Sequence, residues 1–268
     1  MANSQPDISS SSQRHAEAWA SAWQSIDAQL SPLGLKAIEA LKLNAGDVVL
    51  DIGCGTGQTL LQLSEHVGST GRVIGVDIAK QLLEVAKQRT ARLPQVALIE
   101  ADAQTLSLGA ASVDAVFSRF GVMAFADPVQ AFANFRRMLK PRGSLAFCCW
   151  RSLEANELDH FPLAAAGLKV EADAAPFSFA DPKHLYQTLE AAGFGDILIR
   201  ARDEKVSSGD LDAMTSVLLQ VGALGRIVRE NQTLRCAAEP RLREALGALG
   251  DPSHVQLLAS IWIVSAKA

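Results

Sequence analysis

Several features that define particular classes of protein are missing from this chain of 268 residues. No apolar run approaches the roughly 20 residues of a membrane span, and no basic segment followed by an apolar one opens the sequence. We therefore expect no membrane span and a cytoplasmic location. The formal net charge is −4 and no block of five like charges occurs, which argues against a nucleic-acid partner, because that partner requires a basic face.

Cysteine is scarce, and its positions indicate neither a cross-link nor a metal site. Of the four cysteines, Cys148 and Cys149 are adjacent within an apolar stretch. Successive side chains of a strand point to opposite faces, so we interpret these two as buried apolar residues. The spacings H-x-E, C-x-x-C and H-x₃-H are absent, and we therefore expect no metal.

Dinucleotide and nucleoside-triphosphate motifs are also missing, although the chain contains a glycine-rich turn. A G-x-G-x-x-G pattern starting at Gly53 needs glycine where Gln58 stands, and Thr56 is not followed by the Lys-Ser/Thr pair of a phosphate-binding loop. The apolar run before the turn ends in Asp51. A carboxylate in this position repels a pyrophosphate and attracts a cationic ligand.

The turn itself has the composition of a ligand site at the end of a buried strand. A continuous apolar run predicts a buried parallel strand. The three glycines that follow allow a sharp turn into a helix and let a ligand approach the backbone closely: Gly53, Gly55 and Gly57. Ligands of open α/β sheets bind at this end of the strands, so we expect a ligand here.

Acidic residues also end the next two predicted strands. Asp77 closes the strand 71–77 and lies 22 residues beyond Gly55, the separation of a carboxylate that holds ribose hydroxyls. Asp102 lies at the end of the strand 96–103, where its carboxylate can accept a hydrogen bond from an adenine amino group. A helix cap explains one such acid, but three in successive β–α turns indicate one shared ligand.

The stretch 48–57 resembles motif I of the class I S-adenosylmethionine-dependent methyltransferases, whose cofactor carries an ammonium, a sulfonium and no phosphate. The likeness is close over about residues 45–151 and looser elsewhere. Further segments resemble a bacterial subgroup related to the ubiquinone and menaquinone methyltransferases: 118–123, 125–128, 136–141 and 149–151. Leu158 stands where that subgroup has an aromatic residue, so the substrate pocket is expected to differ.

The resemblance implies S-adenosyl-L-methionine as the cofactor and gives the matching residues their roles. Asp51 and the glycine turn face the methionine end, Asp77 holds the ribose, and Ile78 packs on the adenine, whose edge bonds to Asp102 and the Ala103 amide. Ser118 and Arg119, just beyond the fourth strand, line the boundary between cofactor and acceptor. The complete expected set is Trp23, Asp51, Gly53, Gly55, Gly57, Asp77, Ile78, Asp102, Ala103, Ser118 and Arg119.

Two of these assignments have alternatives. Arg119 pairs either with an acidic group of the acceptor or cofactor, or with a neighbouring acid of the chain. Trp23 and Trp19 form either an aromatic lid that meets the sulfonium or part of the packed core. Among the histidines, only His160 lies in an insertion expected to cover the acceptor, and it is the one weak candidate for a general base.

The expected fold is α/β and Rossmann-like: a seven-stranded, mostly parallel sheet in the order 3-2-1-4-5-7-6, with helices on both faces and a small helical cap. A disordered lead over 1–12 precedes a single domain over 13–268, which begins with a helix over 14–30 and has its cofactor-binding core at about 31–151. Two insertions form the cap: an irregular one at about 152–180 and a mostly helical one at about 207–252.

The insertions carry apolar residues that a doubly wound domain does not need for its core. We expect them to enclose an acceptor pocket with Phe120, Met123, Phe161 and Met214, whereas a homodimer interface is the alternative. The predicted function is methyl transfer by in-line displacement to a small, aromatic or lipophilic acceptor. The alternatives are a cofactor-binding sensor or partner subunit without transferase activity, an NAD(P)-dependent oxidoreductase, and a methyltransferase that acts on protein.

Overall fold

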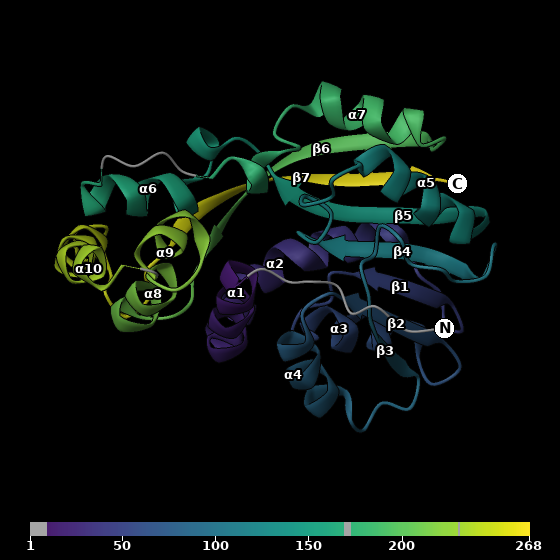
Figure 1. Ribbon diagram of the computed structural model, residues 1–268, viewed down its shortest axis with the longest axis horizontal. Helices are drawn as coiled ribbons and strands as arrows, with labels where there is room; N and C mark the ends of the chain where they lie inside the picture. The colour runs from purple at the N-terminus through teal and green to yellow at the C-terminus, as the bar shows by residue number, and fades with distance from the viewer. Residues whose placement is uncertain (1–9, 169–172, 230) are drawn as a thin grey trace.

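The computed structural model describes residues 10–168, 173–229 and 231–268, and its helices and strands alternate along much of the chain (Figure 1). The elements are α1 (Ser10–Ser21), α2 (Trp23–Leu41), β1 (Val48–Ile52), α3 (Gln58–Val67), β2 (Arg72–Asp77), α4 (Lys80–Thr90), β3 (Val96–Glu100), β4 (Val113–Arg119), α5 (Pro128–Met138), β5 (Leu139–Trp150), the short η1 (Leu153–Ala155), α6 (Glu157–Ala166), the short η2 (Ala175–Phe177), α7 (Pro182–Ala191), β6 (Gly195–Val206), α8 (Leu211–Leu218), α9 (Gly222–Val228), α10 (Gln232–Gly247) and β7 (Leu257–Lys267).

The seven strands form one sheet in the order β3-β2-β1-β4-β5-β7-β6, which confirms the predicted order. Pairing is parallel from β3 across to β5. β7 is antiparallel to both of its neighbours, β5 and β6. Parallel strands bring their carboxyl ends to the same edge, so the turns after β1, β2 and β3 and the end of β4 are neighbours there.

Helices cover both faces of the sheet, as predicted, and each face has an apolar core. α2, α3 and α4 cover one face, on which Phe117 and Cys148 are buried. α5 and α7 cover the other face, on which Phe147 and Cys149 are buried. The adjacent cysteines therefore point to opposite faces and both are free thiols, which confirms their interpretation as buried apolar residues.

The N-terminal region corrects the predicted single helix over 14–30. It forms two helices that are separated at Ala22, whose φ of −104° and ψ of 12° interrupt the helix. α2 continues through Pro32 because its apolar residues beyond the proline are buried against the sheet, which outweighs the lost backbone hydrogen bond. The lead predicted over 1–12 ends too late, since residues 10–12 belong to α1, and its first nine residues lie outside the described residues.

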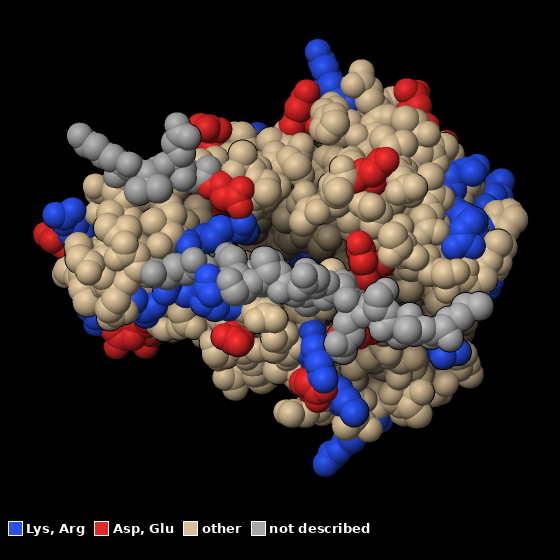
Figure 2. Space-filling view, viewed as in Figure 1, with Lys and Arg blue, Asp and Glu red and all other residues tan. Residues whose placement is uncertain are grey.

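The two insertions form a helical cap at one end of the sheet. The first, predicted to be irregular, contains α6, and the second contains α8, α9 and α10. Five buried cap residues belong to the same apolar cluster as the α2 face of the sheet: Leu158, Met214, Val217, Leu224 and Leu242. The cap therefore has no separate core. The surface is hollowed between the cap and the sheet (Figure 2).

No single helix within the described ranges is both long and apolar enough to cross a membrane; α8 and α9, taken together as a pair bent by 63°, meet such a criterion of length and composition. In the same part of the chain, no group of three or more His, Cys, Asp or Glu side chains is arranged to hold a metal ion.

Candidate cofactor and acceptor site

The turn between β1 and α3 has a backbone conformation that favours glycine. Gly53, Gly55 and Gly57 have φ angles of 69°, 55° and 86°. A Cβ at Gly53 would lie 2.7 Å from the Cα of Gly121, so this turn and the one after β4 meet backbone to backbone. A Cβ at Gly55 would meet nothing within 4 Å. The turn is therefore packed on one side and open on the other, as a ligand cradle requires.

Asp51 is fully buried in β1, beneath this turn. Its Oδ2 accepts a hydrogen bond from Oγ1 of Thr59 at 2.5 Å, whereas its Oδ1 has no hydrogen-bond partner among the described residues. Burial raises the pKa of this carboxyl to about 7, against the hydrogen bond from Thr59 and the charge of Arg119. A ligand that brings a positive charge and a donor would offset the cost of this unpartnered oxygen.

Asp77 at the end of β2 connects the glycine turn to the start of α4. Its Oδ2 accepts from the N–H of Gly55 and its Oδ1 from the N–H of Ala79, both at 2.9 Å. Burial raises the pKa of this carboxyl, and the backbone hydrogen bonds oppose the rise. The backbone of Ile78 also contributes a hydrogen bond to this carboxyl, and a carboxylate has about four acceptor positions, so capacity remains for a ligand hydroxyl. The adjacent Ile78 is 41% exposed and offers an apolar face at the same place.

The third acid, Asp102, lies beyond the end of β3, next to the end of β2. Its Oδ1 accepts from the N–H of Gln104 at 2.9 Å, and the neighbouring Ala103 is buried. The strand pairing places Asp77 opposite Glu100, and Asp102 follows Glu100 by two residues. Asp77 and Asp102 therefore lie at the same corner of the sheet. The fold therefore brings together the three acids that the sequence singled out.

Ser118 and Arg119 are the last two residues of β4, so the prediction that they follow the strand is wrong. Ser118 is completely buried; its hydroxyl donates to the carbonyl of Ile52 at 2.7 Å and accepts from the N–H of Gly121 at 3.0 Å. Its hydroxyl therefore fastens two turns together, and the side chain offers no surface to a ligand.

Arg119 has the second of its two expected environments, an ion pair within the chain. Its Nη2 lies 3.7 Å from Oδ1 of Asp27 on α2, and its Nη1 donates to Oε1 of Gln58 at the start of α3. The arginine stem also lies against Gly34 of α2, where a Cβ would come 2.9 Å from its Cδ. Arg119 thus braces α2 against the glycine turn.

Asp27 is the functional-site residue whose role sequence reasoning missed. No local pattern of the sequence pairs it with arginines that are distant along the chain. Besides Arg119, it binds Arg89 of α4 at 2.6 Å, and Arg89 also donates to the carbonyl of Thr56 at 2.9 Å. The guanidinium of Arg89 lies 4.0 Å from the ring centre of Trp23. One acid therefore links α2, α4, β4 and the glycine turn.

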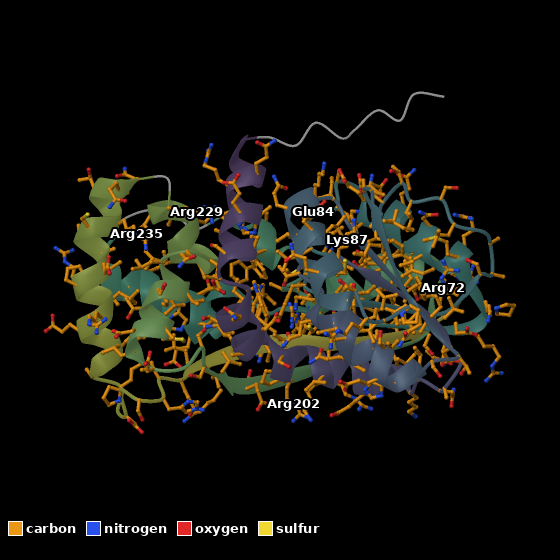
Figure 3. The ribbon with its side chains drawn as sticks, turned by 90° about the horizontal axis from the view of Figure 1, so that it is seen from below. Arg72, Glu84, Lys87, Arg202, Arg229 and Arg235 are labelled. Carbon is orange, nitrogen blue, oxygen red and sulfur yellow. The ribbon has the colours of Figure 1, made fainter. Side chains whose placement is uncertain are left out.

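The helix α1 lies between the core and the cap, where a lid is expected. It packs against α4 and α2, and Figure 3 shows Glu84 and Lys87 of α4 on one side of it and Arg229 of the cap region on the other. Burial and the charges of Arg226 and Arg229 lower the pKa of His15 on α1 to about 4. Trp19 packs on the apolar cluster with a buried indole N–H that lacks a hydrogen-bond partner within the described residues.

The four predicted pocket residues are only partly brought together. Phe120 and Phe161 are half-buried and pack against the apolar cluster that includes Met214. Phe120 also stacks on Trp150 at the end of β5, with ring centres 4.0 Å apart. Met123 packs against the cluster of the opposite sheet face, so its grouping with the other three is wrong.

Met214, the fourth predicted pocket residue, and His160 are placed unfavourably for their expected roles. Met214 is 0% exposed, and its sulfur accepts a hydrogen bond from Nε2 of Gln29 at 3.5 Å, so it packs α8 on α2 and leaves no surface to a pocket. His160 is exposed on α6, next to the buried Asp159. Asp159 accepts from the N–H of Ala223 at 2.9 Å and so joins α6 to α9.

Known proteins are similar to this chain in both sequence and fold. A family described as a methyltransferase domain matches residues 50–147. The demethylmenaquinone methyltransferase of Staphylococcus epidermidis is 32% identical over 180 residues, which cover 61% of this chain and 74% of that protein. An uncharacterized 37.1 kDa protein in transposon TN4556 of Streptomyces fradiae is 40% identical over 108 residues, which cover 40% of this chain but only 31% of that protein.

The chain belongs to the class I S-adenosylmethionine-dependent methyltransferases. Its fold agrees: phosphoethanolamine N-methyltransferase 2 of Haemonchus contortus, solved in complex with S-adenosyl-L-methionine, superposes with a TM-score of 0.60 at 18% identity, covering 94% of this chain and 57% of that one. S-adenosyl-L-methionine is the cofactor of this methyltransferase. The residues at the turn fit that cofactor, because Asp51 has an unpartnered buried oxygen, Gly55 borders open space and Ile78 is exposed.

Proposed function

We propose that this methyltransferase acts on a small, lipophilic or aromatic acceptor, which enters between the cap and the carboxyl ends of β4 and β5. The observation that carries this proposal is the set of half-buried aromatic rings that pack on one apolar cluster at that place: Trp19, Phe120, Trp150 and Phe161. Apolar and aromatic walls with few polar groups are typical of sites for small molecules. A protruding side chain of a protein substrate would have to pass both α1 and the cap.

The cofactor half of the site has a separate role for each acid. Asp51 directs its free Oδ1 toward the cationic methionine end, Asp77 binds the ribose hydroxyls while it keeps the glycine turn in place, and Asp102 binds the adenine edge. Ile78 packs on the adenine ring. The ion pairs of Asp27 hold α2 and the turn at a fixed distance, so that the cradle is formed before the cofactor arrives.

When bound, the cofactor supplies an activated methyl group whose in-line transfer leaves a neutral thioether. The chain therefore has no general acid to provide, and its tasks are to align the acceptor and to exclude water. α1 and the cap perform the second task by covering the site. A general base is needed only where the acceptor is a hydroxyl or a protonated amine, and the exposed position of His160 on α6 does not favour it in that role.

The acceptor class is tested by methyl transfer from radiolabelled cofactor to a panel of lipophilic phenols and quinols, hydrophilic amines and unfolded protein. We expect turnover with the lipophilic aromatic members. Turnover only with protein would contradict the acceptor assignment. Tight cofactor binding without transfer to any member would favour the sensor or partner subunit.

A pair of variants tests the location of the acceptor. Phe161→Ala should raise the acceptor KM by about fivefold, because it removes the part of the phenylalanine ring surface that the acceptor would contact. Cofactor affinity should stay unchanged. Tyr186→Ala is the matched control, since Tyr186 is 44% exposed on α7, away from the cap. Equal acceptor KM values in the two variants would mean that the acceptor does not bind next to α6.

A further inference from the structure

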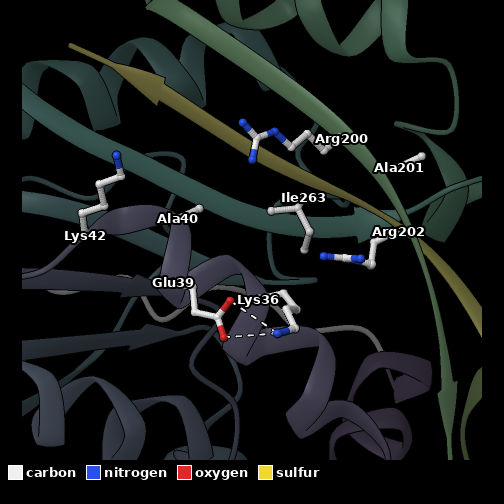
Figure 4. Close-up of a pocket in the computed structure, with 8 residues that line it drawn as sticks. All are labelled: Lys36, Glu39, Ala40, Lys42, Arg200, Ala201, Arg202 and Ile263. Atoms are coloured by element: carbon white, nitrogen blue, oxygen red, sulfur yellow. Dashed lines mark hydrogen bonds and ion pairs between the residues drawn. The ribbon is translucent and has the colours of Figure 1, made fainter.

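A second concave surface lies outside the cofactor site. A groove runs between α2 and the edge strand β6, over β7, on the sheet face that α2 only partly covers (Figure 4). It consists of two cavities of about 590 and 370 Å³ that share Ala40, Lys42, Arg200 and Ile263. The described residues that line it differ from those of the glycine turn and the acids around it, so the methyltransferase site does not account for it.

The walls of the groove are basic. Lys36 of α2 and Lys42, which directly follows that helix, stand on one side, and Arg200 and Arg202 of β6 stand on the other (Figure 4). Lys36 is paired with Glu39 at 3.2 Å. Within the part of the chain that the structure describes, Lys42, Arg200 and Arg202 have neither a hydrogen-bond nor an ion-pair partner. Three cations without an ion-pair partner among the described residues therefore border one groove, and the acids that line it are Glu39, which pairs with Lys36, and the exposed Asp196.

The two arginines have a spacing that an extended chain matches. They are two residues apart in one strand and so share a face, with Cα atoms about 7 Å apart. Arg200 lies opposite Ile263 in β7, and Ile263 with Ala40 makes an apolar floor. Carboxylates on alternate residues of an extended peptide have the same period as the arginines, and guanidinium groups bind carboxylates in a bidentate manner.

The same observations argue against other occupants. Single-stranded nucleic acid stacks its bases on aromatic rings, and none of the described residues that line the two cavities is aromatic. A second copy of the chain in a two-fold dimer would bring this basic groove against itself. A membrane surface is flat at this scale, whereas the cations lie along a concave channel. Charges on an edge strand also prevent strand aggregation, but that role does not require Lys36 or Lys42.

We propose that the groove binds an extended acidic segment of a partner protein, with carboxylates at alternate residues paired to Arg200 and Arg202. The test uses a fluorescein-labelled decapeptide of alternating glutamate and serine, and measures anisotropy at low salt against the full-length chain. We expect saturable binding that weakens at least tenfold in the Arg200→Gln/Arg202→Gln variant. A decapeptide of alternating glutamine and serine should not bind.

The matched control is Arg72→Gln/Arg92→Gln, which removes two exposed arginines elsewhere; Figure 3 shows Arg72 far from Arg202. It should leave peptide affinity unchanged. The charge-reversed variant Arg200→Glu/Arg202→Glu should instead bind a decapeptide of alternating lysine and serine, which shows that the variant is folded and that the contact is direct. Cofactor affinity should stay unchanged in all variants, so this test does not depend on the proposed acceptor.

Three outcomes would overturn the proposal. The first is absence of saturable peptide binding to the unmodified chain. The second is equal affinity in the Arg200→Gln/Arg202→Gln variant, which would place the peptide elsewhere. The third is tighter binding of inorganic tripolyphosphate, or of phosphatidylglycerol vesicles, through the same two arginines, which would make the groove a phosphate or membrane site.

Discussion

Two regions of the molecule are each stabilised by a different kind of interaction: the cofactor corner, which consists of Asp51, the glycine turn, Asp77 and Asp102, and the helical cap. Around the glycine turn, buried acids bind backbone N–H groups and arginines: Asp77 fixes Gly55, and Asp27 binds Arg89 and Arg119. The cap instead merges its apolar residues with the core under α2. A polar cradle can be encoded in a few residues with fixed spacing, whereas apolar packing is spread over many exchangeable positions. The first is therefore suited to an invariant cofactor and the second to a variable acceptor.

The largest expected effect is the loss of stability caused by a substitution in the apolar packing between the cap and α2. Met214→Ala should lower the free energy of unfolding by about 2–5 kcal/mol, because it leaves a cavity between α8 and α2 at a position with no exposure. Denaturant unfolding measures this directly. Leu249→Ala, at a residue that is 45% exposed, is the control and should change stability by less than about 0.5 kcal/mol. If Met214→Ala instead raised the acceptor KM and left the free energy of unfolding unchanged, Met214 would belong to the acceptor pocket.

On the polar side, Asp77→Ala should weaken cofactor binding by about 1.5–3 kcal/mol, since charge-assisted hydrogen bonds to the ribose are lost. Titration calorimetry with S-adenosylhomocysteine is the measurement. Asp114→Ala is a suitable control, because Asp114 pairs with Lys140 at 2.7 Å at the opposite end of β4. If both variants kept normal affinity, the assignment of Asp77 would have to be abandoned.

The pKa of Asp51 predicts a pH dependence of cofactor affinity. A carboxyl with a pKa of about 7 is mostly protonated at pH 5.5 and mostly ionised at pH 7.5. Affinity for the cationic cofactor should therefore rise about tenfold across this interval, since the ionised form pairs with the ammonium. Asp51→Asn should remove the dependence and bind weakly throughout. An unchanged pH profile in this variant would assign the titration to another group.

The same group links pH to stability in the opposite direction. The folded pKa lies above the ordinary value of 3.8 for an aspartate, so between about pH 4 and 7 the folded chain holds a proton that the unfolded chain has released. The free energy of unfolding without cofactor should thus fall as pH rises through that window, as far as Asp51 is concerned. Asp51→Asn should flatten this slope in denaturant titrations at pH 5, 6 and 7.

The smallest effect concerns α1, which touches both regions. Removal of residues 1–21 should weaken cofactor binding by about fivefold in a folded protein, because the site loses its cover while α2 and Asp27 remain. Calorimetry gives the affinity and circular dichroism checks the fold. Unchanged affinity would mean that Trp19 and its helix only pack on the core.

Much of the cofactor corner was predictable because its signals are local. The acids at the ends of β1 and β2, the glycines between them and the strand order follow from short patterns that have one structural solution. The partners of Arg119 were not predictable beyond two alternatives, because Asp27 lies on a helix remote in sequence. Ser118 was misassigned for a similar reason: the sequence shows a hydroxyl near a strand end, and only the fold shows that Ile52 and Gly121 satisfy it.

The sequence by itself determined the sheet, the family and the three acids of the cofactor corner, since alternation of buried strands, glycine turns and helices is encoded within short segments. Only the tertiary structure decided that Met123 and Phe120 pack against different apolar clusters, that the N-terminal region breaks into α1 and α2, and that Arg200 and Arg202 face Lys36 and Lys42 across a groove. Those outcomes depend on which surfaces meet after folding, and residues far apart in sequence carry no local signal of their contact.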